Sequence, residues 1–132
     1  MRIVLDTNVL VAGLLNPRGN PASILNAVLD EVVVVLLDDR ILDEYRDVLQ
    51  RPRFGFPSDT VNALLDFFEH HGEYIVAGPA SGAVTDPDDA PFYDVAIAGN
   101  AEYLVTGNAK HFPRGDQIVS PAEFTKAIRD IL

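Results

Sequence analysis

Oxygen-bearing side chains follow two short apolar segments of this chain. Asp6 comes directly after residues 2–5, and Asn108 follows residues 103–106 across a single glycine. Short apolar runs of this kind predict β-strands, so both side chains are expected at the carboxyl end of a strand. In open parallel α/β sheets that edge is where ligands bind. Asp6 is therefore a candidate metal ligand or nucleophile, and Asn108 offers a neutral oxygen to a metal-bound water or a phosphate.

Both residues also have a purely structural interpretation. Asp6 can cap the helix that follows it, although Thr7 and Asn8 are equally able to do so. Asn108 can be a turn residue, because asparagine tolerates positive φ. The sequence leaves these alternatives open.

Two further carboxylates lie within expected helices. Glu44 falls at the margin of the apolar stripe of residues 39–49, so it either extends to water or leans over the edge of the sheet. Residues 92–99 are apolar almost all round, which is typical of a buried helix. Asp94 within that helix must be paired, hydrogen-bonded or metal-bound. The helix contains no lysine or arginine to pair with it, which favours a functional role for Asp94.

A third acidic group precedes this helix. Asp86, Asp88 and Asp89 stand close to its expected amino end, where negative charge interacts favourably with the helix dipole. At least one of them is expected to do only that. Asp89 is close enough to the start of the helix to reach a site shared with Asp94.

The elements that must position these residues alternate along the chain. We expect strands at residues 2–5, 32–37, 73–77, 102–106 and 117–120. We expect helices at residues 8–15, 21–30 after an Asn20 cap, 39–50 after Asp38 or Asp39, 58–70 with Ser58 as the cap, 91–101, and 121 to the end. This alternation predicts a three-layer α/β/α sandwich with a central parallel sheet. The 132 residues are enough for one domain and too few for two.

Composition narrows the cellular setting. The chain has no cysteine, which excludes disulfides and thiolate metal sites and fits a reducing cytoplasm. No secretory leader is evident at the start of the sequence. The longest apolar run, residues 32–37, is too short to cross a bilayer. We therefore expect a cytoplasmic protein with no membrane partner.

The net charge of −10 argues against nucleic-acid binding, because phosphate contacts require lysine and arginine. The objection weakens if several acids form one metal site, since bound divalent ions would reverse the local sign. An RNA-binding surface would then depend on a small set of cations, namely Arg18, Arg40, Arg51, Arg53, Lys110 and Arg114.

Several other enzyme classes find no support. The sequence contains no HExxH zinc motif, no Walker loop, no GxGxxG and no GxSxG nucleophile elbow. The three histidines, His70, His71 and His111, carry no recognisable motif.

Four motifs in order resemble the PIN domains, named for the PilT N-terminus. They are residues 3–10 (IVLDTNVL), 41–49 (ILDEYRDVL), 86–101 around DPDDAPFYD, and 103–112 (YLVTGNAKHF). The closing segment IVSPAEF is also similar, so the resemblance covers nearly the whole chain. Within the family, the chain looks most like the toxins of bacterial and archaeal toxin–antitoxin pairs, with VapC-type toxins as relatives.

The resemblance implies a ribonuclease that depends on Mg²⁺ or Mn²⁺ and hydrolyses RNA phosphodiester bonds. Asp6, Glu44 and Asp94 match the acidic ligands, with Asp89 as a further ligand, and the Asp88–Asp89 pair competes with Asp94 for the third place. Many relatives have aspartate where this chain has Asn108, and the change removes one charge that would hold a second metal. Thr7, Asn8, Thr106 and Asn108 are expected to support the ligands. A cognate antitoxin that covers the acidic cluster and a homodimer are the implied protein partners.

Two alternatives remain. The chain could be an inactive PIN scaffold that binds RNA or protein, which Asn108 and the net charge favour. It could also resemble haloacid dehalogenase-like phosphatases, with Asp6 as the nucleophile. Those enzymes usually carry a second aspartate two residues on, where this chain has Asn8, so the phosphatase is the weaker alternative.

Overall fold

A computed structural model describes residues 1–80, 84, 86–115 and 117–130. Five parallel strands form one sheet in the order β3-β2-β1-β4-β5. The strands are β1 (Arg2–Leu5), β2 (Val34–Leu37), β3 (Glu73–Tyr74), β4 (Tyr103–Val105) and β5 (Ile118–Val119). The α-helices are α1 (Thr7–Leu15), α2 (Asn20–Leu29), α3 (Asp39–Leu49), α4 (Ser58–His71), α5 (Ala90–Ala98) and α6 (Pro121–Arg129). Three short 3₁₀ helices are η1 (Pro52–Phe54), η2 (Pro87–Asp89) and η3 (Ala109–His111).

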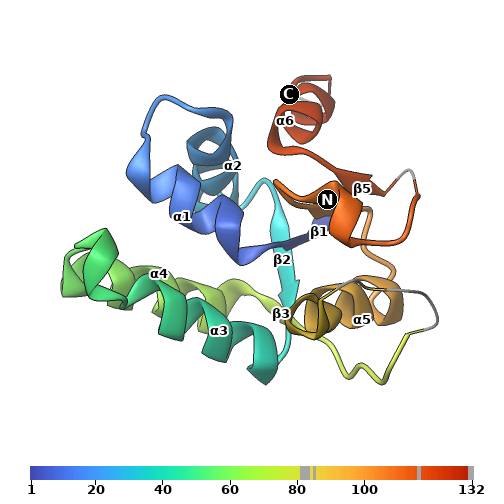
Figure 1. Ribbon diagram of the computed structural model, residues 1–132. Helices are drawn as coiled ribbons and strands as arrows, with labels where there is room; N and C mark the ends of the chain where they lie inside the picture. Colours follow the sequence, from blue (N-terminus) through green and yellow to red (C-terminus); the bar gives the residue numbers. More distant parts are fainter. Residues whose placement is uncertain (81–83, 85, 116, 131–132) are drawn as a thin grey trace.

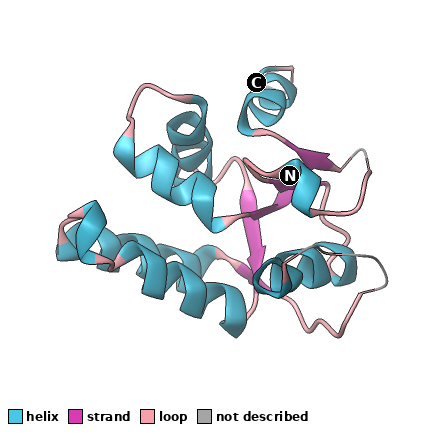
Figure 2. Cartoon of the chain, in the orientation of Figure 1, coloured by secondary structure: helices cyan, strands magenta, loops and turns pink. Residues whose placement is uncertain are grey.

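Helices cover both faces of this sheet, which confirms the predicted α/β/α sandwich. In Figure 1, α3 and α4 lie on one side of β2 and α5 lies on the other. Helix α5 packs against β1, β2 and β4, and α6 packs beside α2. Figure 2 shows the short strands enclosed between these helices. Among the described residues, no helix is long and apolar enough to cross a membrane.

The central strand β1 is the most deeply buried element. Ile3, Val4 and Leu5 are fully enclosed, because parallel sheets are covered on both faces. Leu5 lies in register with Val105 of β4, so the residues after these two strands come out side by side at the carboxyl edge.

The order of the strands also marks this place as a binding edge. From β1 the chain crosses to β2 on one side, whereas β4 and β5 lie on the other side of β1. The carboxyl ends of β1 and β4 therefore meet where the strand order reverses. In open α/β sheets a ligand crevice forms at this reversal.

Four of the five predicted strands are longer than the observed ones, and two of them, β2 and β3, differ by more than one residue at one end. Strand β2 begins at Val34 because the amides of Val32 and Val33 bond back to the Ala27 carbonyl at the end of α2. Strand β3 ends at Tyr74 because it is an edge strand, and the chain leaves the sheet so soon that Val76 is 100% exposed.

Two predicted helix caps are wrong by one residue. Gly19 and Pro57 hold the N-cap positions, so Asn20 and Ser58 become the first helical residues. Pro57 fits there because its φ of −59° suits the turn before a helix. Of the two residues predicted to cap α3, Asp38 does so, and it accepts a hydrogen bond from the Ile41 amide at 3.1 Å.

Candidate active site

Asp6 and Thr106 lie side by side at the carboxyl ends of β1 and β4. The Thr106 hydroxyl donates to Oδ2 of Asp6 at 2.7 Å, and the Asp6 amide donates to the Val105 carbonyl at 3.0 Å. The Asn108 amide donates to the Thr106 hydroxyl at 3.0 Å. Asp6 and Thr106 are both buried. A chain of hydrogen bonds therefore fixes the Asp6 carboxylate and connects it to the loop that carries Asn108.

The Asp6 side chain does not serve as a helix cap. Asp6 occupies the N-cap position of α1, but its carboxylate makes no capping hydrogen bond. Burial raises its pKa above the ordinary aspartate value, and the Thr106 hydroxyl and the backbone amides of Thr7 and Asn8 oppose that rise. The Thr106 hydroxyl and the amides at the start of α1 thus stabilise the charged form of a buried carboxylate at the binding edge.

Glu44 leans over the same edge. It projects from α3, is half-buried, and accepts a hydrogen bond from the Thr7 hydroxyl at the start of α1. The next residue anchors the helix, because the buried Tyr45 hydroxyl donates to the Leu5 carbonyl at 2.6 Å. Burial raises the pKa of Glu44, and the negative charges of Asp6 and Asp89 raise it further.

Asp89, the last residue of η2, completes a group of three carboxylates. Burial raises its pKa, followed by repulsion from Asp6 and Asp86, while His111 opposes the rise. The Asp89 carboxylate lies 3.5 Å from the His111 imidazole. Asp6, Glu44 and Asp89 are thus three partly desolvated acids that repel one another, and we call them the acidic triad.

The other two aspartates before α5 act on this group only through their charge, since Asp86 raises the pKa of Asp89 and Asp88 raises that of Glu44. Asp86 caps η2 by accepting from the Asp88 amide at 3.0 Å, and both residues are exposed. The predicted capping role is therefore found at Asp86, which caps η2.

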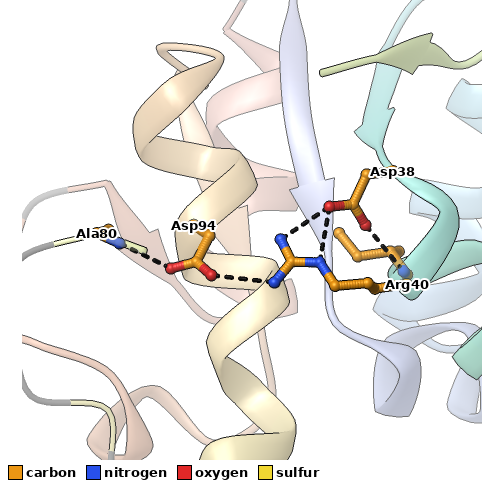
Figure 3. A network of polar contacts seen from close by, with 5 residues as sticks. Asp38, Arg40, Ala80 and Asp94 are labelled. Carbon is orange, nitrogen blue, oxygen red and sulfur yellow. Dashed lines mark hydrogen bonds and ion pairs between the residues drawn. The ribbon is translucent and has the colours of Figure 1, made fainter. Parts of the chain in front are cut away.

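Asp94 is buried, as its position in an apolar helix predicted, but it has partners outside that helix. It is 8% exposed. Its Oδ2 lies 3.2 Å from the Arg40 guanidinium, and its Oδ1 accepts from the Ala80 amide at 3.0 Å. Arg40 also binds Asp38 at 2.8 and 2.9 Å (Figure 3). The carboxylate of Asp94 is therefore paired with an arginine, whereas the triad carboxylates are held by threonine hydroxyls and, at Asp89, by a histidine.

The remaining predicted residues surround the triad as supports. Thr7 is buried against Glu44, as described above. Asn8 accepts from the Gly107 amide at 3.3 Å, which ties α1 to the loop after β4. Asn108 itself is exposed. Its amide holds Thr106, and its carbonyl accepts from the His111 amide at 2.9 Å.

Sequence reasoning missed the place of His111. The imidazole faces Asp89 across the site, yet the residue belongs to no motif. The signal that was available is its spacing: it follows Asn108 by three residues, within one turn of η3 at the carboxyl edge.

The donor set of the triad fits a hard divalent cation. Mg²⁺ and Mn²⁺ prefer carboxylate and water oxygens. An added positive charge would offset the burial that raises all three pKa values and the repulsion that further raises those of Glu44 and Asp89. Within the described residues, no three carboxylates or imidazoles converge closely enough to ligate one ion as they stand. Binding would therefore require the side chains of the triad to rotate. The His111 imidazole, which lies beside Asp89 and is a cation only when protonated, would have to move away from that carboxylate.

Comparison with known proteins identifies the family of this chain. The sequence model of the PIN domain matches residues 2–110, a span that contains all three acids of the triad. The uncharacterized protein MJ1680 of Methanocaldococcus jannaschii is 27% identical over 111 residues, which is 82% of this chain and 71% of that protein. PIN domains are generally nucleases and typically use divalent metal ions. The chain therefore belongs to the PIN domain family.

Proposed function

We propose that this protein is a ribonuclease that depends on Mg²⁺ or Mn²⁺ and hydrolyses RNA phosphodiester bonds. The acidic triad carries the proposal, because β1, α3 and η2 bring three carboxylates with raised pKa values to one edge of the sheet. A desolvated, mutually repelling set of acids destabilises the fold, and such sets are found preferentially at functional sites.

Asp6, Glu44 and Asp89 would hold the ion. When bound, a divalent cation supplies Lewis acidity, which lowers the pKa of a water and offsets the charge that develops on phosphate oxygens. Thr106 and Thr7 orient two of the carboxylates through their hydroxyls. The carboxylates would position the attacking water, so no covalent enzyme intermediate is formed.

Asp89 fills the third acidic place better than Asp94 does. The negative charges of Asp6 and Asp89 influence each other and Glu44, whereas Asp94 is engaged by Arg40 and the Ala80 amide. We assign Asp94 to positioning the two helices and Asp89 to the ion.

The toxin role and the protein partners belong to the same proposal. An antitoxin would place a basic residue on the acidic triad and thereby stop cleavage, and the toxin would act in the cytoplasm as a homodimer. The support is the likeness to toxin-type PIN domains and the open, acidic edge that such a partner would cover. Loss of cleavage on addition of the antitoxin, together with dimer mass in solution, would test this part.

An inactive scaffold is the second candidate. Two observations favour it. Asn108 is neutral where the resemblance to PIN domains leads us to expect an acid, and the three triad carboxylates as described do not converge on one point. The phosphatase alternative is weaker, because Asn8 binds the Gly107 amide and has no proton to transfer.

The test is cleavage of a mixed RNA panel with Mg²⁺, with Mn²⁺ and with a chelator. Metal-dependent cutting that disappears in Asp6→Asn supports the ribonuclease. A folded protein that binds metal and RNA but cuts nothing supports the scaffold. A trapped phosphoaspartate on Asp6 would support the phosphatase.

A further inference from the structure

The loop that follows β4 carries two cations, and its His111 imidazole contacts Asp89 of the acidic triad. Lys110 and Arg114 line the same shallow hollow of about 370 Å³, together with Ala109, Pro113, Gly115 and Ile118. Both side chains belong to exposed residues, and neither forms an ion pair with another described residue.

Most arginines elsewhere are already engaged. Arg2, Arg40, Arg46 and Arg51 each bind one or two carboxylates, and Arg53 lies over the Phe54 ring at 4.8 Å. Of the six cations that the sequence offered for an RNA surface, Arg18, Arg53, Lys110 and Arg114 form no ion pair with a described carboxylate. Lys110 and Arg114 are the two of these that lie on the loop after Thr106, the loop whose His111 contacts Asp89.

The loop is held in a fixed relation to the triad. The Asn108 amide binds Thr106, which binds Asp6. One turn later the His111 imidazole reaches Asp89. Phe112 is buried and anchors the segment in the core, and the Ile118 amide bonds back to the Gly115 carbonyl at 3.2 Å.

We propose that Lys110 and Arg114 form a phosphate-binding surface that holds the backbone of a single RNA strand next to the acidic triad. That the bound strand is RNA rests on the proposed function, whereas the argument from charge does not. With a net charge of −10, the chain repels a polyanion over most of its surface, so the strand must be held where cations remain available. Two cations on one hollow would grip consecutive backbone groups without reading the bases.

Binding of a short fluorescent single-stranded RNA of mixed sequence, followed by anisotropy, tests this surface. The parent is Asp6→Asn, so that the measurement does not depend on cleavage. The loop variant adds Lys110→Gln and Arg114→Gln. The matched control adds Lys126→Gln and Arg129→Gln, which remove the same charge from the last turn of α6.

The loop variant should weaken binding about tenfold at low salt and flatten the slope of log affinity against log salt by about 1.4, since two phosphate contacts at roughly 0.7 each are lost. The control should stay within about twofold, and all variants should unfold at the same temperature. The proposed surface would be overturned if the loop variant and the control lost RNA affinity equally, if neither lost any, or if the parent bound no RNA. A protein that binds RNA through this loop but never cuts it would refute only the ribonuclease.

Discussion

The guanidinium of Arg40 lies 3.2 Å from the carboxylate of Asp94 and joins the start of α3 to the middle of α5. Helix α3 carries Glu44 one turn after Arg40, and α5 begins directly after Asp89. The pair therefore connects the two elements that bring two of the three triad acids to the sheet edge. Asp38 extends the connection to the end of β2 (Figure 3).

This relationship separates the roles of Asp94 and Asp89. Asp94→Asn should lower the free energy of unfolding by about 1–3 kcal/mol, because it weakens a hydrogen bond to a charged group. It should leave intact the rise in melting temperature that Mg²⁺ gives. Asp89→Asn should do the reverse, removing the Mg²⁺ effect without loss of metal-free stability. If Asp94→Asn abolishes the Mg²⁺ effect while Asp89→Asn retains it, the two assignments must be exchanged.

The raised pKa values predict how stability varies with pH. Asp6, Glu44 and Asp89 have folded-state pKa values above their ordinary ones, so the folded protein binds protons more tightly than the unfolded chain. Their contribution to stability is fully present below an ordinary carboxyl pKa of about 4 and is lost as pH rises through the raised values.

Asp6→Asn removes the most buried of these charges. It should therefore stabilise the metal-free protein at neutral pH by about 1 kcal/mol, or a few degrees in melting temperature. The gain should vanish as the pH falls to about 4.

Glu123 is the control of opposite sign. The Ser120 amide and hydroxyl lower its pKa, so Glu123→Gln should destabilise at neutral pH and not at acid pH. Melting curves from acid to neutral pH check both variants. A difference in melting temperature between Asp6→Asn and the wild type that does not change with pH would contradict this prediction.

Thr106 should matter more than an ordinary buried threonine. Its hydroxyl donates to Asp6 and accepts from the Asn108 amide, so Thr106→Val leaves both groups short of a partner. We expect a loss of about 1–3 kcal/mol and weaker Mg²⁺ binding.

Thr125→Val is the matched control, because the Thr125 hydroxyl is also largely buried but donates only to the Pro121 carbonyl of its own helix. Chemical denaturation and Mg²⁺ titration compare the two variants. Equal effects on Mg²⁺ binding would remove Thr106 from the site.

Asn108→Asp should add the negative charge that the resemblance to PIN domains leads us to expect at this position. The residue is exposed and lies on the loop beside Asp6, so a carboxylate there would add an oxygen ligand at little cost to folding. We expect a several-fold rise in Mn²⁺ affinity, measured by calorimetry against Asn62→Asp, a remote and equally exposed change in α4. A rise of the same size in both variants would mean that net charge alone is responsible.

The sequence predicted the sheet edge well, because local patterns determine it. The apolar run before Asp6 and the run before Asn108 were enough to place both residues at carboxyl ends of strands. The stripe of α3 left Glu44 with two possible orientations, and only its packing against Thr7 decides between them.

Contacts between distant segments were beyond the reach of the sequence. Nothing in residues 90–98 shows that Arg40 pairs with Asp94, since the two are 54 residues apart. The place of His111 likewise depends on how η3 folds back toward η2. The early end of β3 follows from its position at the edge of the sheet, which composition alone does not give.

The most direct test of the acidic triad is the rate of RNA cleavage across a Mn²⁺ titration for identically purified proteins. The set is the wild type, the three single variants Asp6→Asn, Glu44→Gln and Asp89→Asn, and Asp94→Asn. The account predicts saturable, metal-dependent cleavage by the wild type, loss of at least about a hundredfold in each triad variant, and a much smaller loss in Asp94→Asn. Cleavage that survives in all three triad variants, or that needs no metal, would contradict it.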